Sequence, residues 1–515
     1  MKTHVQRIMG WLALILLVVW VSAGAAETTR LTILHINDFH GRILPDTKTE
    51  LDKPVAGAAY LAAMIKAERS KNPTGTVLLS AGDMFQGTCE SNGCQGAPVI
   101  EMMNELKFDA MALGNHEFDW GMTVFNRMRK KAAFPFLAAN IVNKKEMPLP
   151  GIRSHRIVQR NKVKVAVIGI ATPDTKYTTK PDNVKDLDFL KPELVLPRLI
   201  KTVRDQGASV VIVLSHLGER DDKLLASAVP GIDVIVGGHS HTAISKPLEP
   251  GNGTIIVQAG YNGLYLGVLE LLIDAQTGRA TGFTDRSGLK RVSAGPEDKT
   301  DRKTALLIKP CVDKTKRELD KPVGDTCVNL VTSLKEETNF GNLITDAMRE
   351  ASGAQIAVHN SGGIRTKISE GKITRRDACN AFPYDNHLVI MDLTAAELKE
   401  LLNQSGKDVK EKGIMQLSGV KVTYDRSKLP GDPYVKATVD GEDLDKKKNK
   451  TYRVVTNDFL AAGGDYIDVF RKAIEQGRSI ENGDKLRDVF EQYLKKHSPV
   501  KPEVEERIVF VNSGK

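Results

Sequence analysis

The sequence has 515 residues, of which 41% are apolar and 27% are charged, and its formal net charge is +9. This length exceeds what one hydrophobic core usually organises, so we expect two domains, and the balanced composition excludes a disordered chain. No basic stretch is interleaved with aromatic residues, so we expect no nucleic-acid polymer as a partner.

The first predicted element is a leader that precedes the fold. Lys2 and Arg7 flank the start of an apolar run at 11–21, which is short for a bilayer span, and small residues follow it. We predict a signal peptide over 1–26 and a protein that is periplasmic or secreted. No cysteine suited to lipid attachment follows the leader and no C-terminal apolar tail suggests an anchor, so we expect no stable membrane anchor. We also expect no obligate protein partner.

Short apolar strands then alternate with helical or loop segments over the first half of the chain. The predicted strands cover 31–36, 76–81, 109–113, 164–171, 210–215, 233–238, 254–260 and 265–274. This alternation predicts a layered α/β domain whose sheets are covered by helices. We place this domain at 27–300.

A charged segment with helical spacing follows at 301–320, and we predict it to be a linker helix. The remaining residues, 321–515, restart with a predicted helix at 339–353 that ends at Gly353. Further strands at 354–360, 387–393, 420–425 and 451–460, with a helix at 395–406, predict a second, smaller α/β domain.

Five cysteines are present, and their spacing suggests local pairs. Cys89 and Cys94 share one Gly-rich loop, and Cys311 and Cys327 flank a Lys-rich stretch. Each pair can form a disulfide in an oxidising compartment, which leaves Cys379 as a buried thiol. The sequence alone leaves the pairing open.

Side chains of the types that bind metals follow five of the predicted strands in the first domain. One such motif alone is more often a turn, but five strand ends together are hard to explain in that way. Ligands of open α/β sheets bind beyond the carboxyl ends of the strands, so we expect these side chains to converge. The candidate ligands are Asp38, His40, Asp83, Asn115, His216, His239 and His241.

Seven candidate ligands are more than one ion needs when water must also bind, so we predict two divalent metal ions. Asp83 is our candidate for the bridging ligand. Imidazole and oxygen ligands without thiolate favour zinc or manganese. Two such ions stabilise an in-line displacement, and a phosphate ester or anhydride is the natural electrophile.

The motifs resemble those of a known family. DFH (38–40), GDMFQG (82–87), GNHEFD (114–119), SHLG (215–218) and GGHSH (237–241) are similar to the calcineurin-like metallophosphoesterases. The onset LTILHINDFHGR and the FQG element narrow the resemblance to the 5'-nucleotidase family. The resemblance implies a four-layer αββα metallophosphoesterase domain, a linker helix and a smaller α/β substrate-binding domain. It also implies attack of a metal-bound hydroxide on the 5'-phosphate of nucleotides.

The stretch GNHEFD combines three different side chains in this interpretation. Asn115 supplies a neutral oxygen to one ion, whereas His116 stays off the metals and stabilises the leaving oxygen. Asp119 lies three residues further on, close enough to fold back and orient the imidazole. We therefore predict His116 and Asp119 to be the catalytic pair.

Three segments of the second domain suggest a nucleotide site. NSGGIR (360–365) offers backbone amides and a guanidinium, while FPYDN (382–386) and NDFLAAGGDY (457–466) offer aromatic rings beside turns. Taken alone these are weak signals, and the family resemblance is what makes them specific. The predicted substrate-binding residues are Asn360, Gly362, Gly363, Arg365, Tyr384, Phe459 and Asp465.

The chain departs from the family pattern at Ser361, Tyr384 and Ala462, and Lys335 stands near the position of an arginine. Lysine does not reproduce a bidentate phosphate contact, so substrate preference remains open. The alternatives are a UDP-sugar hydrolase, a 2',3'-cyclic-nucleotide phosphodiesterase, a sulfur-compound hydrolase and a non-catalytic nucleotide-binding protein. In this family the second domain rotates about the linker, and we take that motion as a hypothesis here.

Overall fold

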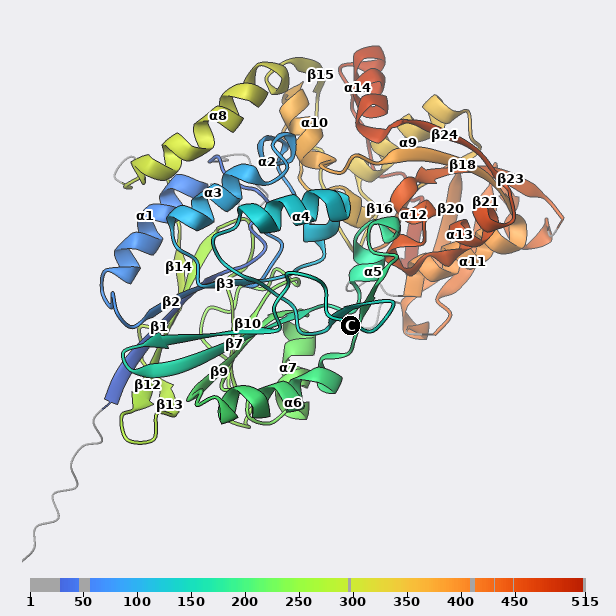
Figure 1. Cartoon of the computed structure of the whole chain (residues 1–515). Coiled ribbons are helices and arrows are strands. Elements are labelled where there is room, and N and C mark those ends of the chain that lie inside the picture. The colour runs from blue at the N-terminus through green and yellow to red at the C-terminus, as the bar shows by residue number, and fades with distance from the viewer. Residues whose placement is uncertain are drawn as a thin grey trace, which may run out of the picture.

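The computed structural model describes residues 28–45, 56–294, 298–407, 413–429, 431–447 and 449–512. The predicted leader at 1–26 lies outside these residues. The described chain forms two α/β halves, and a long helix, α8 (Arg302–Leu319), lies across the top of the first half in Figure 1. This helix occupies the position of the predicted linker helix.

The first half contains two sheets that stack face to face. One has the order β13 (Ala280–Phe283), β12 (Tyr265–Asp274), β1 (Thr28–Ile36), β2 (Thr76–Ser80), β3 (Ala110–Ala112) and β4 (Phe136–Leu137), and β14 (Gly288–Arg291) pairs with β12. The other has the order β11 (Ile255–Gln258), β10 (Val234–Gly237), β9 (Val210–His216), β7 (Val163–Ala171) and β6 (His155–Arg160).

Helices cover the outer face of each sheet. Alternate residues of β1 point in opposite directions, so Leu34 packs toward the helices whereas Ile33 packs toward the second sheet. The helices are α1 (Ala58–Arg69), α3 (Ala97–Glu105) and α4 (Gly121–Lys131) on one side and α6 (Pro192–Asp205) and α7 (Glu219–Ala228) on the other. Three buried clusters separate the layers, which confirms the four-layer αββα arrangement.

The central strands of both sheets are parallel, and this places their carboxyl ends at common edges. β1 runs parallel to β2, β2 to β3, and β9 runs parallel to both β7 and β10. The short elements that lie between these strands along the chain are α2 (Cys89–Gly93), η1 (His116–Phe118), β5 (Ile141–Asn143), α5 (Thr175–Thr178), η2 (Pro181–Asn183) and β8 (Leu187–Phe189).

The second half has a five-stranded sheet with buried clusters on both faces. Its strands are β19 (Met415–Ser418), β16 (Ile356–Asn360), β23 (Thr451–Asn457), β18 (His387–Thr394) and β24 (Ser479–Lys485). One face is covered by α9 (Asn339–Ser352) and α14 (Leu486–His497), and the other by α11 (Ala395–Lys407) and α13 (Asp468–Glu475). Gly353 ends α9 in the left-handed conformation, as predicted.

Smaller elements complete the second half. A four-stranded sheet has the order β22 (Glu442–Asp443), β21 (Tyr434–Val439), β20 (Val420–Asp425) and β25 (Ile508–Val511), and β15 (Pro322–Thr326) pairs with β17 (Gly371–Thr374). The short helices are η3 (Ser361–Gly363), α10 (Arg375–Ala381), η4 (Arg426–Lys428), η5 (Leu444–Lys446), α12 (Asp458–Ala461) and η6 (Gly464–Tyr466).

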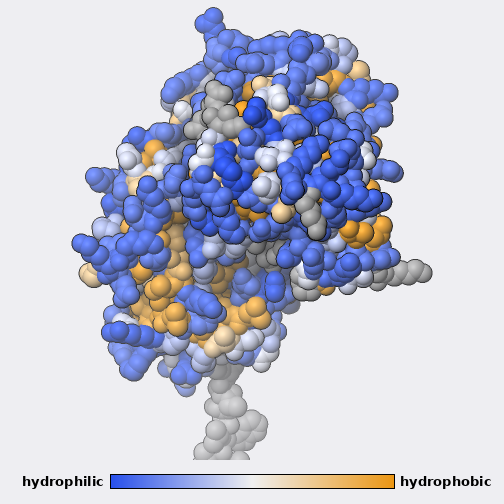
Figure 2. All heavy atoms as spheres, turned by 90° about the vertical axis from the view of Figure 1, so that its right-hand side faces the viewer, coloured by the Kyte–Doolittle hydropathy of each residue, from blue (hydrophilic) through white to orange (hydrophobic). Residues whose placement is uncertain are grey.

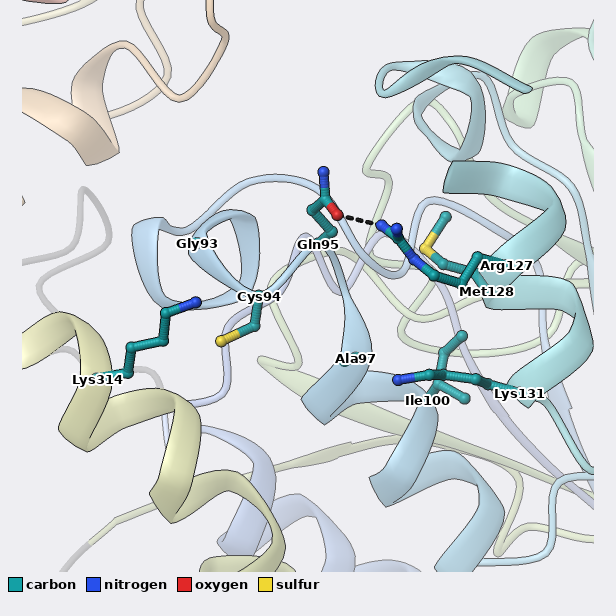
Figure 3. Close-up of a pocket in the computed structure, with 9 residues that line it drawn as sticks. All are labelled: Gly93, Cys94, Gln95, Ala97, Ile100, Arg127, Met128, Lys131 and Lys314. Carbon is teal, nitrogen blue, oxygen red and sulfur yellow. Dashed lines mark hydrogen bonds between the residues drawn. The ribbon is translucent and has the colours of Figure 1, made fainter. Parts of the chain in front are cut away.

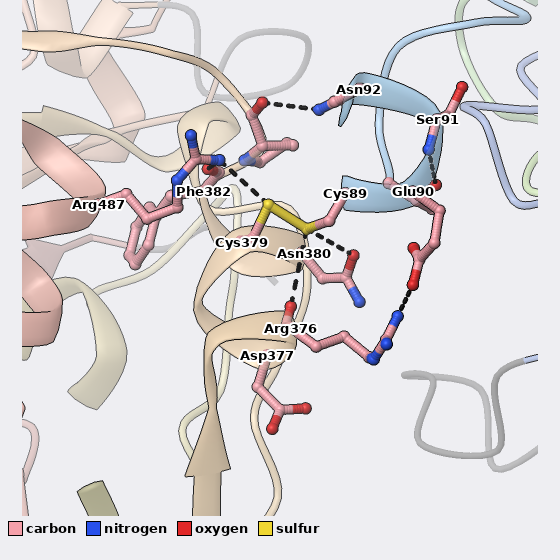
Figure 4. Close-up of a disulfide and its surroundings, with 12 residues drawn as sticks. Cys89, Glu90, Ser91, Asn92, Arg376, Asp377, Cys379, Asn380, Phe382 and Arg487 are labelled. Atoms are coloured by element: carbon pink, nitrogen blue, oxygen red, sulfur yellow. Dashed lines mark hydrogen bonds and ion pairs between the residues drawn. A yellow bond between two sulfur atoms is a disulfide. The ribbon is translucent and has the colours of Figure 1, made fainter. Parts of the chain in front are cut away.

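The predicted disulfide pairing is wrong. Cys89 bonds to Cys379 on α10, as Figure 4 shows, and Cys94 bonds to Cys311 on α8, while Cys327 is free and exposed. Cys89 begins α2 and Cys94 caps its other end. Five residues of helix rise about 7.5 Å and turn the side chains about 140° apart, beyond the reach of one disulfide. One cysteine therefore faces α10 and the other faces α8.

The face of the molecule on which the second half lies is mainly polar. Figure 2 views the side on which the second half lies, and hydrophilic side chains dominate it apart from apolar patches, the largest in its lower part. Large apolar side chains that are exposed include Leu194, Met147, Leu224 and Leu306. Within the described ranges, no helix combines the length and apolar character needed to cross a membrane.

Candidate active site

The carboxyl ends of β1, β2, β9 and β10 bring six of the seven predicted ligands together. The seventh, Asn115, follows β3 and directly precedes His116, whose backbone N–H donates to Asp83. Two clusters form there, each with three ligand atoms within 4.8 Å of one another. One contains Asp38, His40 and His241, and the other contains Asp83, His216 and His239. The convergence expected from strand ends is therefore present in the structure.

The two clusters adjoin one another. His40 Nε2 lies 3.1 Å from His241 Nε2, and His241 Nε2 lies 3.6 Å from Asp38 Oδ1. In the second cluster, His216 Nε2 lies 3.0 Å from Asp83 Oδ2 and also 4.0 Å from Asp38 Oδ1. His216 therefore adjoins both carboxylates. Whether Asp83 bridges two ions stays a prediction.

Unusual backbone conformations aim these side chains. Asp38, His40, Asp83, His239 and His241 have φ angles between 49° and 74°, a left-handed region that non-glycine residues rarely adopt. Such conformations persist only where the surroundings hold them, and they are common at functional sites. They turn the chain sharply at the strand ends, so that consecutive ligands reach inward.

Glycines let the strand ends approach closely. A Cβ on Gly82, where φ is 95°, would lie 2.6 Å from the backbone nitrogen of Gly114 and 2.8 Å from His216 Nδ1. A Cβ on Gly114 would overlap the carboxylate of Asp83. The glycines of GDMFQG and GNHEFD are thus required by close packing around the ligands.

The donor set fits divalent metal ions. Asn115 is buried and its Nδ2 donates to the carbonyl of Thr178 at 3.0 Å, while its Oδ1 has no hydrogen-bond partner among the described residues. The imidazoles are oriented from behind by carbonyls, since His40 Nδ1 lies 3.1 Å from Gln86 O and His216 Nδ1 lies 2.6 Å from Ala81 O. Such contacts fix the tautomer of a metal-binding histidine.

Protonation in the site is also consistent with cation binding. Burial lowers the pKa of His40, His239 and His241, that of His239 to about 3, so these imidazoles are neutral and able to bind a metal. Burial also acts to lower the pKa of His216, but Asp83 raises it to about 10. Without a cation, His216 is therefore protonated beside the Asp83 carboxylate, and a cation bound between them would displace that proton.

The predicted catalytic pair lies beside the clusters. His116 Nδ1 and Asp119 Oδ2 are 2.7 Å apart, and the backbone N–H of His116 donates to Asp83 Oδ1 at 2.8 Å. Burial alone would lower the pKa of His116, but the carboxylates of Asp119 and Asp83 raise it above its ordinary value. The imidazole ring lies 5.4 Å from that of His40.

The predicted substrate residues approach this centre from the second half. The Tyr384 ring stacks on the His116 ring with centroids 5.7 Å apart, and the charge of Arg365 acts on His40, His116 and His241. Asn360 Nδ2 donates to Asp465 Oδ2 at 2.9 Å.

Other predicted substrate residues pack within their own loops. The Phe459 ring packs against Gly464, and Gly362 and Gly363 belong to η3. A Cβ on Gly363 would lie 2.6 Å from the His359 ring. Lys335 is exposed. The sandwich of a base between Tyr384 and Phe459 stays a prediction.

Three buried residues at the site escaped the sequence analysis. Glu117 accepts the backbone N–H groups of Asp83, Met84 and Gly114, and so ties two ligand loops together. Asn37 Nδ2 donates to Asp38 Oδ2 at 2.7 Å, and Thr179 Oγ1 donates to Asp119 Oδ1 at 2.8 Å. Glu117 and Asn37 lie inside the recognised motifs, and this position could have identified them as site residues. No motif marks Thr179.

A separate pocket of about 200 Å³ lies where α8 meets the segment after α2 and α4 (Figure 3). Arg127, Lys131 and Lys314 line it together with Cys94, and Arg127 bonds to Gln95. None of its lining residues belongs to the predicted site, so this pocket is distinct from the ligand clusters.

Comparisons with known proteins agree with this geometry. Residues 31–243 match the family described as calcineurin-like phosphoesterase, and residues 322–472 match the family described as 5'-nucleotidase, C-terminal domain. The fold and the site therefore define a metal-dependent phosphoesterase. The 5'-nucleotidase of Homo sapiens is 31% identical, over 96% of this chain and 92% of its own length. The chain accordingly belongs to the 5'-nucleotidase family, and the resemblance is confirmed.

A solved structure and a second relative support the same assignment. A 5'-nucleotidase precursor from Thermus thermophilus is 30% identical and covers 94% of this chain and 100% of its own, with a TM-score of 0.86. The trifunctional nucleotide phosphoesterase protein YfkN of Bacillus subtilis is 32% identical over 93% of this chain. This chain spans only 35% of the length of YfkN.

Proposed function

We propose that this protein removes the 5'-phosphate from nucleotides with two divalent ions, zinc or manganese. The seven strand-end residues would hold the ions, and Asp83 is the candidate to contact both. The observation that carries the proposal is the His116–Asp119 pair, which lies beside both ligand clusters and beneath Tyr384 of the second half. Relatives named 5'-nucleotidase, which this chain matches over 92% of their length, support the nucleotide as substrate.

The protein residues have separate tasks in this reaction. Divalent ions in the site supply Lewis acidity to the phosphoryl group and activate water. Asp119 occupies Nδ1 of His116, which leaves Nε2 for the substrate, and a proton on Nε2 would pass to the leaving oxygen. In this proposal Arg365 adds positive charge near the phosphate, and Asn360 and Asp465 bind the nucleoside together with Tyr384.

Phosphate release from AMP, with added manganese or zinc, tests the proposal. We expect turnover by the metal-loaded protein and a loss of about 100-fold or more in His116→Ala with the metal content unchanged. Parallel reactions with UDP-glucose and 2',3'-cyclic AMP identify a sugar-nucleotide hydrolase or a cyclic phosphodiesterase. A metal-loaded protein that binds adenosine and hydrolyses none of these esters would contradict the proposal and support a binding protein.

The organisation of the chain is proposed as 27–300 for the catalytic domain, 301–320 for the linker and 321–515 for the substrate-binding domain. We also propose export through the leader at 1–26. Two disulfides among the described cysteines support an oxidising compartment. N-terminal sequencing of the purified protein tests this, because an intact Met1 would contradict cleavage.

A further inference from the structure

One segment of the first half touches both the predicted catalytic pair and the second half. It comprises residues 177–180, the end of α5 and the turn after it, and we name it the α5 strap. We propose that Thr179, within this strap, is a positioning residue that acts on His116 through Asp119. This proposal rests on the proposed function, because it assigns Thr179 to the step in which His116 acts.

The two oxygens of the Asp119 carboxylate have different partners. Thr179 Oγ1 donates to Oδ1 at 2.8 Å, and Oδ2 lies 2.7 Å from His116 Nδ1. A carboxylate held by one partner can rotate about its Cβ–Cγ bond, whereas one held at both oxygens cannot. Thr179 is only 1% exposed, so water has little access to replace its hydroxyl. The hydroxyl therefore sets the plane in which Asp119 meets the imidazole.

The strap is fixed to the same loop at further points. The carbonyl of Thr178 accepts a hydrogen bond from Asn115 Nδ2 at 3.0 Å. Just beyond the strap, Asn183 Nδ2 donates to the carbonyls of Phe118 and Asp119 at 2.9 and 2.8 Å. These bonds fix the position of Thr179 relative to the GNHEFD loop, so its hydroxyl is held beside the Asp119 carboxylate.

The opposite side of the strap contacts the second half. Lys180 Nζ lies 2.8 Å from Asp458 Oδ2, and the ring of Tyr177 lies 4.1 Å from that of Tyr466. Asp458 and Tyr466 are the sequence neighbours of the predicted substrate residues Phe459 and Asp465. Docking of the substrate loops therefore holds the strap, and through Thr179 the strap holds the catalytic pair.

Threonine variants separate this role from a general effect on folding. Thr179→Val keeps the shape and removes the hydroxyl, whereas Thr179→Ser keeps the hydroxyl. Thr175→Val is the matched control, because the buried hydroxyl of Thr175 donates only to the carbonyl of Thr172, which also accepts the Thr175 N–H. Each variant is assayed on AMP, whose adenosine leaving group is poor, and on 4-nitrophenyl phosphate, whose 4-nitrophenolate leaving group is good. The metal content of each variant protein is also measured.

We expect Thr179→Val to lower kcat for AMP about tenfold, with KM and metal content within twofold of wild type. The loss for 4-nitrophenyl phosphate stays within twofold, since its leaving group needs little help from His116. Thr179→Ser and Thr175→Val match wild type. An unchanged kcat for AMP, an equal loss on both esters, or a fall in metal content would overturn the proposal.

A double-mutant cycle with Asp119→Asn supplies an independent readout. If Thr179 acts through Asp119, the two losses do not multiply in the double variant. Losses that multiply would overturn the proposal even where both proteins fold, and Thr179→Ala replaces the valine variant if that protein does not fold. Failure of the proposed function is distinguishable, because the wild-type protein itself would then release no phosphate from AMP.

Discussion

At the scale of single residues, the site depends on backbone conformations that side-chain chemistry alone does not favour. Five predicted ligands adopt positive φ values, as does Asp465 in the second half at 50°. Each such conformation costs on the order of 1–3 kcal/mol. The packing of Gly82 and Gly114 and the bonds of Glu117 offset this cost. The ligands are therefore preorganised by the fold.

Asp119 is the residue whose role is most easily separated from metal binding. We predict that Asp119→Asn lowers turnover of AMP by roughly 100-fold, because the amide no longer holds the His116 tautomer. The metal content, measured by atomic emission, stays at the wild-type level. Asp182→Asn, at an exposed position in η2, is the control. Loss of metal together with turnover would instead identify Asp119 as a ligand.

At the scale of elements, the sequence predicted what depends on local pattern and failed where distant contacts decide. Strand ends bearing Asp38, Asp83 and His216 converge because parallel strands share an edge, and that rule needs no structure. Thr179 lies in a turn without a motif, since its importance comes from a partner 60 positions away. The pairing of Cys89 likewise depends on which helix packs against α2.

The start of α11 carries a helix-capping motif that can be read from the sequence and is formed in the structure. In TAAE, Thr394 Oγ1 accepts the backbone N–H of Glu397, and Glu397 Oε2 accepts the backbone N–H of Thr394, a capping box. Arg478 also donates to both oxygens of Glu397, and this bond chiefly lowers the pKa of Glu397 from 4.5 to about 2.

A carboxyl group whose pKa is lower in the folded than in the unfolded protein stabilises the fold at pH values above its unfolded pKa. This stabilisation is lost as the pH falls through the folded pKa. We predict that Glu397→Gln lowers the free energy of unfolding by about 2 kcal/mol at pH 7. The difference shrinks between pH 4.5 and pH 2, where wild-type Glu397 becomes protonated. Thermal unfolding midpoints at pH 7 and pH 3 measure it, with the exposed Glu400→Gln as control. A difference independent of pH would contradict this account.

At the scale of the whole molecule, the two halves are joined by α8 and again by the disulfide from Cys89 to Cys379. Around that disulfide, Arg376 pairs with Glu90 and Asn92 Nδ2 donates to the carbonyl of Pro383 at 2.8 Å (Figure 4). The second disulfide joins α2 to α8, which packs on the first half. A rotation of the second half must therefore break the first disulfide or leave it in place as a pivot.

We predict that the oxidised protein keeps, in solution, the arrangement of its two halves that the structure shows. Its radius of gyration, measured by small-angle scattering, should not change when nucleotide is added. The double variant Cys89→Ser/Cys379→Ser should be larger without nucleotide, whereas Cys94→Ser/Cys311→Ser should match wild type. Equal radii for all three proteins would show that non-covalent contacts hold the halves. Equal turnover of the oxidised wild type and the Cys89→Ser/Cys379→Ser variant would count against rotation as a required step.

The two disulfides are nested, because Cys94–Cys311 closes within the loop that Cys89–Cys379 closes, and this matters during the proposed export. A chain that enters the oxidising compartment with its N-terminus first delivers Cys89 and Cys94 together, before Cys379, which lies 290 residues after Cys89. Oxidation in the order of appearance would join the first two cysteines wrongly. The entering chain must therefore keep Cys89 reduced until its C-terminal half arrives, or rely on thiol–disulfide exchange to release it.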